Sequence, residues 1–540
     1  MIDLLPRLGR RTAKLVIRSG GLPTFKALED ITGVAYNNKS SVAFFPRETR
    51  MLELMLKAAP LPLSESVQLW YDFEIGMEKE SAALLLQEDV ELAHEKASIL
   101  RKYQRIGVDF MVHGCRTLMC DEMGLGKTAQ TIVAVETTRF HRSMMVVCPN
   151  SVKYQWQEEI LKWTQCDQPI TVIEWKNRVE QLESYAGGWL ILNYHNFRSD
   201  TAFQSMGYWD WVIFDEAHKL KNRKSQTFSA AKAMKSKRMA LLTGTPTGND
   251  VSEVWALLHL LNPMRYTSFW RFFEMYVGYY QDYFGARKIF GVRNPELLRR
   301  ELSTRMVQRK KKDVLPELPA KIHQTVPVQM TKTQKRTYDR MAKEAAILMT
   351  SGELLTAVNQ MAVLMRLRQI LSTTANFDLP DHSGKLDAAV ELIQNAGKKV
   401  IVFTVFRKTV MAVLRRLDVA GIKSVRIMGG VSAEDRQLAK QAINTSDTQV
   451  LVCTIKSGGL GLNLQGASVG IFVEKEWNPI DQAQAEDRMH RIGQTETVHI
   501  ISLICQGTVD ESVERLLAKK QRMTDEILKE TLFAELRKYT

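Results

Sequence analysis

The stretch that decides the fold is RTLMCDEMGLGKTAQTIVAVE, residues 116–136. It opens as a short apolar run, passes through a turn with two glycines, and continues with the apolar spacing of a helix. A strand, such a turn and a helix form the setting of a phosphate-binding loop. Gly124 and Gly126 let backbone amides face phosphate oxygens, Lys127 supplies positive charge, and Thr128 supplies a hydroxyl for magnesium. The stretch therefore predicts a nucleotide site in an α/β domain.

The loop departs from the general pattern at Asp121, where a glycine is usual. A glycine-rich turn without a ligand is the alternative interpretation. A second motif favours the nucleotide, because the apolar run WVIFDEAH, residues 211–218, ends in adjacent carboxylates. Asp215 can hold magnesium there, and Glu216 can polarise the attacking water. Together the two motifs predict a hydrolytic site.

Short apolar runs alternate with helical patterns over residues 100–245 and again over residues 399–504. This alternation is typical of parallel sheets wrapped by helices. We predict an α/β fold of two lobes with helical insertions. The predicted parts are an N-terminal accessory segment at 1–95, a first lobe at 96–250, helical insertions with a linker at 251–380, a second lobe at 381–510, and a C-terminal helical brace at 511–540.

The composition narrows the class of protein. A chain of 540 residues exceeds what one hydrophobic core serves, and its formal net charge of +14 favours a polyanionic partner such as nucleic acid. We find no apolar stretch near the roughly eighteen residues that a membrane span needs, so we expect a soluble protein without a membrane partner. The cysteines are scattered, which favours a reduced compartment without zinc: Cys115, Cys120, Cys148, Cys166, Cys453 and Cys505.

Five motifs in order along the chain, DEMGLGKT, DEAH, LTGTP, SGGLGLNLQ and QAEDRMHRIGQ, resemble the Swi/Snf-type family of helicase superfamily two. The resemblance covers about residues 95–520, and this family writes its phosphate loop with an aspartate at the position of Asp121. The form of QAEDRMHRIGQ after EWNP is most similar to the annealing-helicase branch. The resemblance implies two RecA-like lobes and an ATP- and magnesium-dependent translocase on double-stranded or forked DNA. It implies remodelling of forks, annealed strands or protein–DNA complexes without reading of the base sequence.

The resemblance also implies roles for single residues. Lys127, Asp215 and Glu216 would act in hydrolysis, and Arg488 and Arg491 would reach the nucleotide from the other lobe. Since these arginines recur with Gln484 at helical spacing, we expect the three on one face of a helix. The nucleotide set comprises Tyr103, Gln104, Asp121, Glu122, Met123, Gly124, Leu125, Gly126, Lys127, Thr128 and Gln484. The coupling and DNA-backbone set comprises His218, Asn150, Ser151, Asn193, Tyr194, Thr243, Gly244, Thr245, Thr454, Ser457, Gly458 and Gly459.

Several interpretations stay open at this point. Lys310, Lys311 and Lys312 contact DNA or keep a linker solvated. An aromatic group is predicted to form the core of an insertion rather than to stack on bases: Trp270, Phe272, Phe273, Tyr276, Tyr279 and Tyr280. A nucleotide-switched binding module and a strand-separating DNA or RNA helicase are the rival functions. We expect a monomeric motor, a protein partner for residues 1–95, and a bacterial or viral-host cytoplasm or a eukaryotic nucleus.

Overall fold

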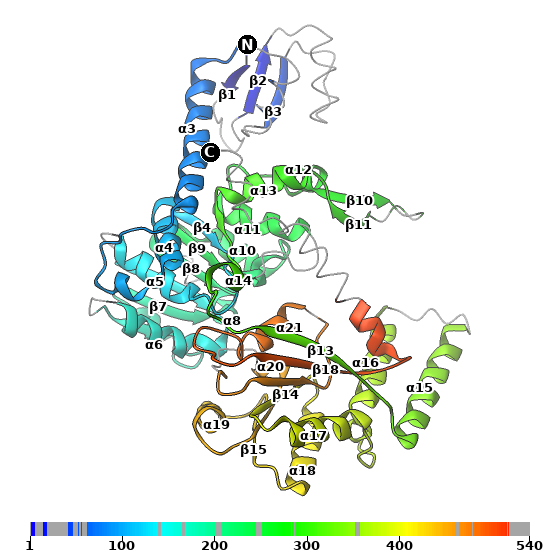
Figure 1. Ribbon diagram of the computed structural model, residues 1–540. Coiled ribbons are helices and arrows are strands. Elements are labelled where there is room, and N and C mark those ends of the chain that lie inside the picture. The colour runs from blue at the N-terminus through cyan, green and yellow to red at the C-terminus, as the bar shows by residue number, and fades with distance from the viewer. Residues whose placement is uncertain are drawn as a thin grey trace. The chain divides into compact units, whose positions relative to one another are not determined.

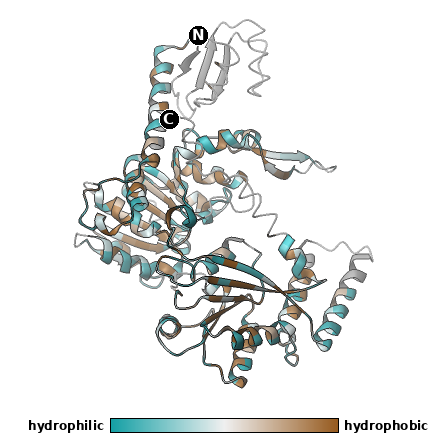
Figure 2. Ribbon diagram, in the orientation of Figure 1, coloured by the Kyte–Doolittle hydropathy of each residue, from teal (hydrophilic) through white to brown (hydrophobic). Residues whose placement is uncertain are grey.

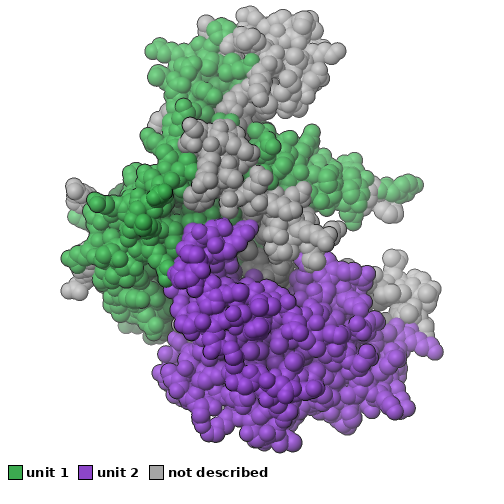
Figure 3. Space-filling view, in the orientation of Figure 1, with its two compact units in different colours: residues 1–121, 127–309, 524–540 green, residues 122–126, 310–523 purple. Residues whose placement is uncertain are grey.

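The structure is a computed structural model (Figure 1). It describes residues 2–5, 14–18, 42–46, 52, 56, 62–138, 142–164, 168–200, 203, 207–244, 251–281, 283, 285, 287–350, 357–458, 464–477, 479–515 and 517. The described chain divides into two compact units. The first contains the described parts of residues 1–121 and 127–309, and the second contains residues 122–126 and the described parts of 310–523 (Figure 3).

The first unit is built on a parallel sheet. Among the described residues this sheet has seven strands in the order β12-β4-β9-β8-β5-β7-β6, and every neighbouring pair is parallel. Both faces are covered, so its strands are continuous apolar runs rather than alternating ones. The strands are β4 (Arg116–Met119), β5 (Ser143–Cys148), β6 (Ile170–Val172), β7 (Gly188–Asn193), β8 (Trp209–Asp215), β9 (Ser236–Leu242) and β12 (Met306–Val307).

Several helices of the first unit begin at a residue whose side chain caps them. Ser64 and Ser225, for example, each accept a hydrogen bond from a first-turn amide of the helix that follows. The α-helices are α3 (Glu65–Leu86), α4 (Lys102–Gly114), α5 (Lys127–Thr137), α6 (Lys153–Trp163), α7 (Arg178–Glu183), α8 (Tyr194–Ser199), α10 (Gln226–Ala233), α11 (Val254–Leu261), α12 (Phe269–Tyr276) and α13 (Pro295–Ser303). Short 3₁₀ turns lie at Glu95–Ile99, Asn150–Val152, Ala217–Leu220 and Val251–Glu253.

The first unit also contains antiparallel strands outside this sheet. Near the N-terminus β1 (Ile2–Leu5), β2 (Lys14–Arg18) and β3 (Val42–Pro46) form a small sheet. Strands β10 (Val277–Gln281) and β11 (Arg287–Val292) form a hairpin after α12. We had expected helical insertions at residues 251–380, but this range also contains strands. These are the hairpin, β12, which belongs to the seven-stranded sheet, and β13, which belongs to the six-stranded sheet.

The second unit is built on a second parallel sheet. Among the described residues its order is β13-β18-β17-β14-β16-β15. Val400 and Val402 of β14 pack into one core cluster, whereas Ile401 and Phe403 pack into another, so helices cover both faces. The strands are β13 (Lys321–Val328), β14 (Val400–Thr404), β15 (Ser424–Ile427), β16 (Val450–Thr454), β17 (Val469–Phe472) and β18 (Val498–Cys505).

The helices of the second unit complete the fold. They are α14 (Lys311–Val314), α15 (Lys332–Thr350), α16 (Ala357–Ser372), α17 (Gly384–Ala396), α18 (Arg407–Val419), α19 (Ala433–Thr445), α20 (Ile455–Gly458) and α21 (Pro479–Glu486), with a 3₁₀ turn at Thr374–Phe377. Figure 2 shows hydrophobic residues gathered in the strands of both sheets. Within the described ranges, no helix has the length and apolar character needed to cross a membrane. The predicted α/β class with two lobes is confirmed, and the exact domain boundaries stay predictions.

Candidate nucleotide site

The predicted residues of the first lobe gather at one edge of its sheet. Strands β4, β9, β8, β5 and β7 are consecutive neighbours and all parallel. Their carboxyl ends therefore meet at the same edge, where ligands of such sheets bind. The residues that follow these strands are Asp121, Thr243, Glu216, Asn150 and Tyr194, in the same order.

The loop after β4 has the backbone of a phosphate-binding turn. Gly124 and Gly126 have φ values of +85° and +79°, which side-chain-bearing residues rarely adopt. Helix α5 begins directly at Lys127, whose Nζ donates to the carbonyl oxygen of Asp121 at 2.6 Å. The side chains of Lys127 and Thr128 are half-buried. An ammonium, a hydroxyl and a helix N-terminus thus lie together, as anion binding requires.

Asp121 has a structural partner that the sequence did not reveal. Its carboxylate is fully buried and accepts two hydrogen bonds from Arg309, to Oδ1 at 2.9 Å and to Oδ2 at 2.5 Å. Gln130 of α5 donates to the same carboxylate at 3.2 Å and accepts from Arg309 at 2.9 Å. Arg309 also donates to the backbone carbonyl of Tyr103. Asp121 therefore anchors the base of the phosphate loop, and its carboxylate is engaged by Arg309 and Gln130.

The predicted adenine-reading pair lies at the start of α4. Tyr103 and Gln104 are both buried, and the Arg309 guanidinium lies 5.1 Å from the centroid of the Tyr103 ring. The side-chain oxygen of Gln104 accepts from the backbone N–H of Arg101 at 2.9 Å, so it caps α4. The role of Gln104 toward adenine stays a prediction.

The carboxylates at the end of β8 form the acidic part of the site. Asp215 Oδ2 accepts from Trp156 Nε1 at 2.9 Å, and Oδ1 accepts from the backbone N–H of Glu216 at 3.0 Å. Burial, together with the charge of Glu216, raises the pKa of Asp215 to about 6. Glu216 has a φ of +53°, in the left-handed region, and its Oε2 lies 3.2 Å from His218 Nδ1. This strained turn places Glu216 beside His218 rather than along the strand.

The residues predicted to touch the DNA backbone separate into exposed and buried ones. Asn150 and Ser151 are exposed, and Asn193 donates to the Asn150 side chain at 3.0 Å. Tyr194 is buried, and its hydroxyl donates to the backbone carbonyl of Asp215 at 2.7 Å. Thr243 is buried too, and its N–H donates to the Met119 carbonyl. Tyr194 and Thr243 therefore support the strand ends.

The rest of the predicted coupling and DNA-backbone set lies partly outside the described residues. Gly244 is half-buried after β9, and Thr245 lies outside the described residues. In the second unit Thr454 is buried at the end of β16, Ser457 is half-buried in α20, and Gly458 ends that helix. Gly459 lies outside the described residues. The roles of these residues toward DNA stay predictions.

Residues 122–126 group with the second unit. Glu122 Oε2 accepts from the backbone N–H of Lys311 at 2.7 Å. Gly124 has no room for a side chain, because an added Cβ would lie 3.0 Å from the Cβ of Arg491. Leu125 is fully buried and Met123 is half-buried. Gly124 and Arg491, which both belong to the second unit, thus lie in contact.

The prediction that Gln484, Arg488 and Arg491 share one face of a helix is wrong, because α21 ends at Glu486. Gln484 is buried on that helix, whereas both arginines are half-buried in the turn beyond it. The acidic residues at the end of α21 pair with basic residues of other elements. These contacts are Lys321 with Glu486 and Asp487 at 3.3 Å, His323 with Glu486 at 2.9 Å, and Lys311 with Asp487 at 2.8 Å.

The lysine run 310–312 is not a uniform surface patch. Lys311 is buried, donates to the carbonyl of His490, and pairs with Asp487. Burial lowers its pKa below the ordinary lysine value. Lys310 is half-buried and Lys312 is exposed. Lys311 therefore holds the arginine turn in place, and DNA contact or solvation stays open only for its two neighbours.

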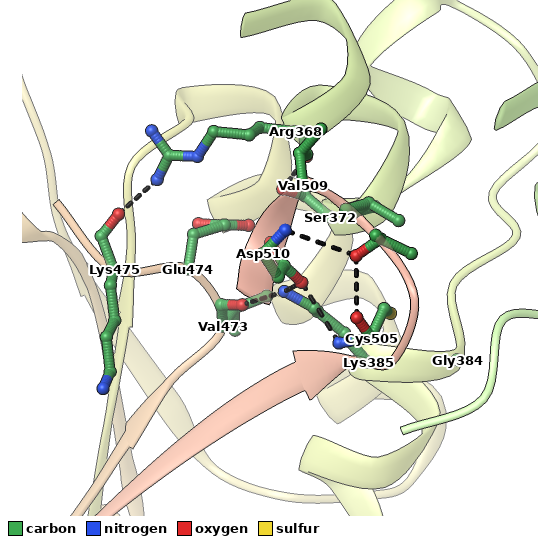
Figure 4. Close-up of polar contacts among 12 residues, drawn as sticks. Arg368, Ser372, Gly384, Lys385, Val473, Glu474, Lys475, Cys505, Val509 and Asp510 are labelled. Carbon is green, nitrogen blue, oxygen red and sulfur yellow. Dashed lines mark hydrogen bonds and ion pairs between the residues drawn. The ribbon is translucent and has the colours of Figure 1, made fainter. Parts of the chain in front are cut away.

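A buried polar network fixes the segment that leads into α21 (Figure 4). Lys385 of α17 donates to the carbonyl of Val473 at 2.8 Å and pairs with Asp510 at 2.7 Å. Arg368 of α16 donates to the carbonyl of Lys475. Both cationic side chains are 1% exposed. The carbonyl oxygens of Val473 and Lys475, before α21, are thus bound by cationic side chains of α17 and α16.

Glu474 lies between those two carbonyls and is held by the end of β14. Its Oε2 accepts from the Thr404 hydroxyl at 2.6 Å and from the Val405 N–H at 2.8 Å. The Arg368 guanidinium lies 4.8 Å from the centroid of the Trp477 ring, within the EWNP motif. The segment that leads into α21 is therefore held by β14 and α16.

The oxygen donors of the first unit fit magnesium. In the parts of the chain that the structure describes, no group of three or more His, Cys, Asp or Glu side chains could hold a metal. Magnesium does not need one, since it usually takes one or two protein oxygens together with phosphates and water. Burial, together with the charge of Glu216, raises the pKa of Asp215, and a bound cation would stabilise its ionised form. Asp215 and Thr128 would hold the ion.

Comparisons with known proteins identify the family. Residues 103–375, just over half of the 540, match the SNF2-related domain, and residues 384–493 match the helicase conserved C-terminal domain. The chain is 28% identical over 460 residues to an uncharacterized ATP-dependent helicase of Mycoplasma genitalium, covering 82% of this chain and 43% of that protein. It is 27% identical over 485 residues to the human SWI/SNF-related matrix-associated actin-dependent regulator of chromatin subfamily A member 1, covering 84% and 46%.

The chain spans about half the length of these curated relatives. Among solved structures, the Sulfolobus solfataricus SWI2/SNF2 ATPase core in complex with dsDNA is 27% identical. That match covers 83% of this chain and 96% of the other, with a TM-score of 0.38.

Proposed function

Because the chain belongs to the SNF2-related family, we propose that it is an ATP-hydrolysing motor that moves along double-stranded DNA by gripping the sugar-phosphate backbone. One observation carries the proposal: the phosphate loop and the Asp215–Glu216 pair lie at the carboxyl edge of one parallel sheet. The relatives' names, ATP-dependent helicase and regulator of chromatin, support it. The formal charge of +14 suits a polyanionic track.

The chemistry follows from the side chains at this edge. Lys127 and the amides at the start of α5 bind the phosphates, and Glu216 takes the proton of the attacking water. Asp215 and Thr128 would hold magnesium, which when bound would neutralise charge on the phosphates. His218 lies 3.2 Å from Glu216, so a change in the charge of Glu216 is felt directly by His218. This contact supports a coupling role for His218.

Hydrolysis requires a contribution from the second lobe in this proposal. Arg488 or Arg491 contacts the transferring phosphoryl group when the lobes close, and such an arginine is worth about 10³–10⁵ in rate. The buried pairs around Asp487 and the network behind Glu474 keep the arginine turn in position for that contact. Alternating closure and opening then advances the backbone grips along DNA.

The test is ATP hydrolysis by the purified chain alone and with single-stranded DNA, duplex DNA, forked DNA or RNA. We expect strong stimulation by duplex or forked DNA. The Lys127→Ala and Glu216→Gln variants should lose hydrolysis and keep DNA binding. Indifference of the wild type to every nucleic acid would refute the motor and favour a nucleotide-switched binding module.

Within this function we propose forks, annealed strands and protein–DNA complexes as substrates. Displacement of a third strand from a triplex reports translocation, and conversion of a forked substrate on a native gel reports remodelling. Release of a single strand from a simple duplex would instead identify a strand-separating helicase. The monomeric state, the cellular compartment and a protein partner for residues 1–95 stay predictions.

A further inference from the structure

The hairpin of β10 and β11 has an exposed aromatic and cationic face that the nucleotide site does not use. Tyr280 pairs directly with Lys288 across the hairpin, so both side chains lie on one face. Phe290 lies in the bulge of β11, and its ring covers Gly278, two residues before Tyr280. Tyr280 is 58% exposed, Phe290 is 64% exposed, and Lys288 is exposed as well. We call Tyr280, Lys288 and Phe290 the hairpin platform.

The opposite face of the hairpin is packed against its own unit. The Arg287 guanidinium lies 4.7 Å from the Trp270 ring centroid, 5.0 Å from that of Tyr279 and 5.5 Å from that of Phe273. Phe273 is buried in the core of the first unit. The aromatic group of the sequence is therefore divided in two: Phe272, Phe273 and Tyr276 are core, as predicted, whereas Trp270 and Tyr280 are exposed.

Gly278 makes room for the Phe290 ring. A Cβ added at Gly278 would lie 2.9 Å from Phe290 Cε2 and 3.0 Å from its Cζ, so a larger residue at this position would displace the ring. Because Gly278 and Tyr280 are two residues apart on β10, they face the same side of the hairpin, and the Phe290 ring lies on that side. Tyr280 and Phe290 are each more than half exposed. The two residues therefore offer aromatic surface on which planar groups can stack.

We propose that the hairpin platform binds unpaired bases of DNA, so that the motor prefers duplex joined to single strand. The inference rests on the proposed function for the identity of the nucleic acid. Base stacking on aromatic rings is tolerant of sequence, and a flanking cation suits the phosphates. Bases inside a duplex hide their faces, so only unpaired nucleotides can stack there. Lys288 adds a positive charge to this apolar surface. The charge favours a partner that carries phosphates over a purely apolar partner.

The test compares the full chain on a blunt duplex and on the same duplex with a single-stranded tail, at one salt concentration. Fluorescence anisotropy measures the affinity for each, and ATP hydrolysis is measured in parallel. We expect tighter binding of the tailed DNA by wild type. The Tyr280→Ala/Phe290→Ala variant should lose this preference, with about 5- to 100-fold weaker binding of the tailed DNA and unchanged binding of the blunt duplex.

Two control variants separate stacking from other effects. Tyr280→Phe keeps the ring and should keep the preference. Tyr208→Ala removes a tyrosine of the first unit that is 60% exposed and lies outside the hairpin, and it should change nothing. Preference for the tail that survives in Tyr280→Ala/Phe290→Ala, or equal affinity of wild type for both DNAs, overturns the proposal and leaves the platform for a protein partner. Absence of DNA-stimulated hydrolysis in wild type would instead refute the proposed function, because the binding comparison does not depend on turnover.

Discussion

Replacement of Arg309 by methionine tests the support beneath the phosphate loop. Arg309 is 2% exposed at its side chain and Asp121 is 0% exposed, so the Arg309→Met variant leaves a buried carboxylate without its cation. Breaking a buried ion pair from one side costs about 3–5 kcal/mol. For a unit of this size that corresponds to a fall of about 6–20 °C in the Tm of its transition. The phosphate loop should also bind nucleotide more weakly, because Asp121 contacts two residues of α5. Its carboxylate accepts a hydrogen bond from Gln130, and its backbone carbonyl accepts one from Lys127.

Differential scanning calorimetry of the full chain measures this effect, with the two units allowed separate transitions. The Lys237→Met variant is the control. It removes a lysine that is 62% exposed from its pair with Asp210 in the same unit, and should cost less than about 1 kcal/mol. The double variant Arg309→Met/Asp121→Asn should recover part of the loss, since no buried charge then lacks a partner. A Tm for Arg309→Met no lower than that of Lys237→Met would refute the reasoning.

Three further outcomes follow from the site. The Mg²⁺ affinity of the protein–ADP complex, relative to that of free ADP at the same pH, should be flat above about pH 6 and fall as pH decreases below it, because the protonated Asp215 carboxyl is neutral. In Glu216→Gln this break should move to lower pH, because the charge of Glu216 adds to burial in raising the pKa of Asp215, and an unmoved break would contradict a contribution of Glu216. Lys385→Met should lower thermal stability by about 3–5 kcal/mol by leaving Asp510 buried and unpaired, whereas Lys408→Met, at an exposed pair, should cost less than about 1 kcal/mol. Arg491→Ala should reduce the rate of hydrolysis about 10³-fold or more with nucleotide binding retained, and weakened binding alone would contradict an action on the transition state.

The sequence predicts the parts of the fold that local patterns determine. The runs at β4, β5, β7 and β8 are continuous and apolar because both faces of a parallel sheet are buried, and all four strands are confirmed. The Swi/Snf resemblance is confirmed by the family matches. The two-residue strand β12 has no such pattern, because only its pairing with β4 defines it.

The missed site features depend on tertiary partners. Arg309 is the first residue of a basic run, and the sequence of that run is typical of a solvated surface. In the structure β12 pairs with β4, and Arg309, two residues after β12, contacts Asp121. Helical spacing favours one face for Arg488 and Arg491, yet α21 ends at Glu486, where Glu486 and Asp487 pair with lysines of distant sequence. Residue type alone predicts a surface position for a charged residue, and only the folded structure shows which charged residues are buried.

The duplex-DNA dependence of ATP hydrolysis in wild type and in Glu216→Gln tests the proposed motor. We expect strong stimulation of the wild type by duplex DNA, and loss of hydrolysis in Glu216→Gln with duplex binding intact. Equal hydrolysis with and without DNA, or unchanged turnover in Glu216→Gln, would contradict it.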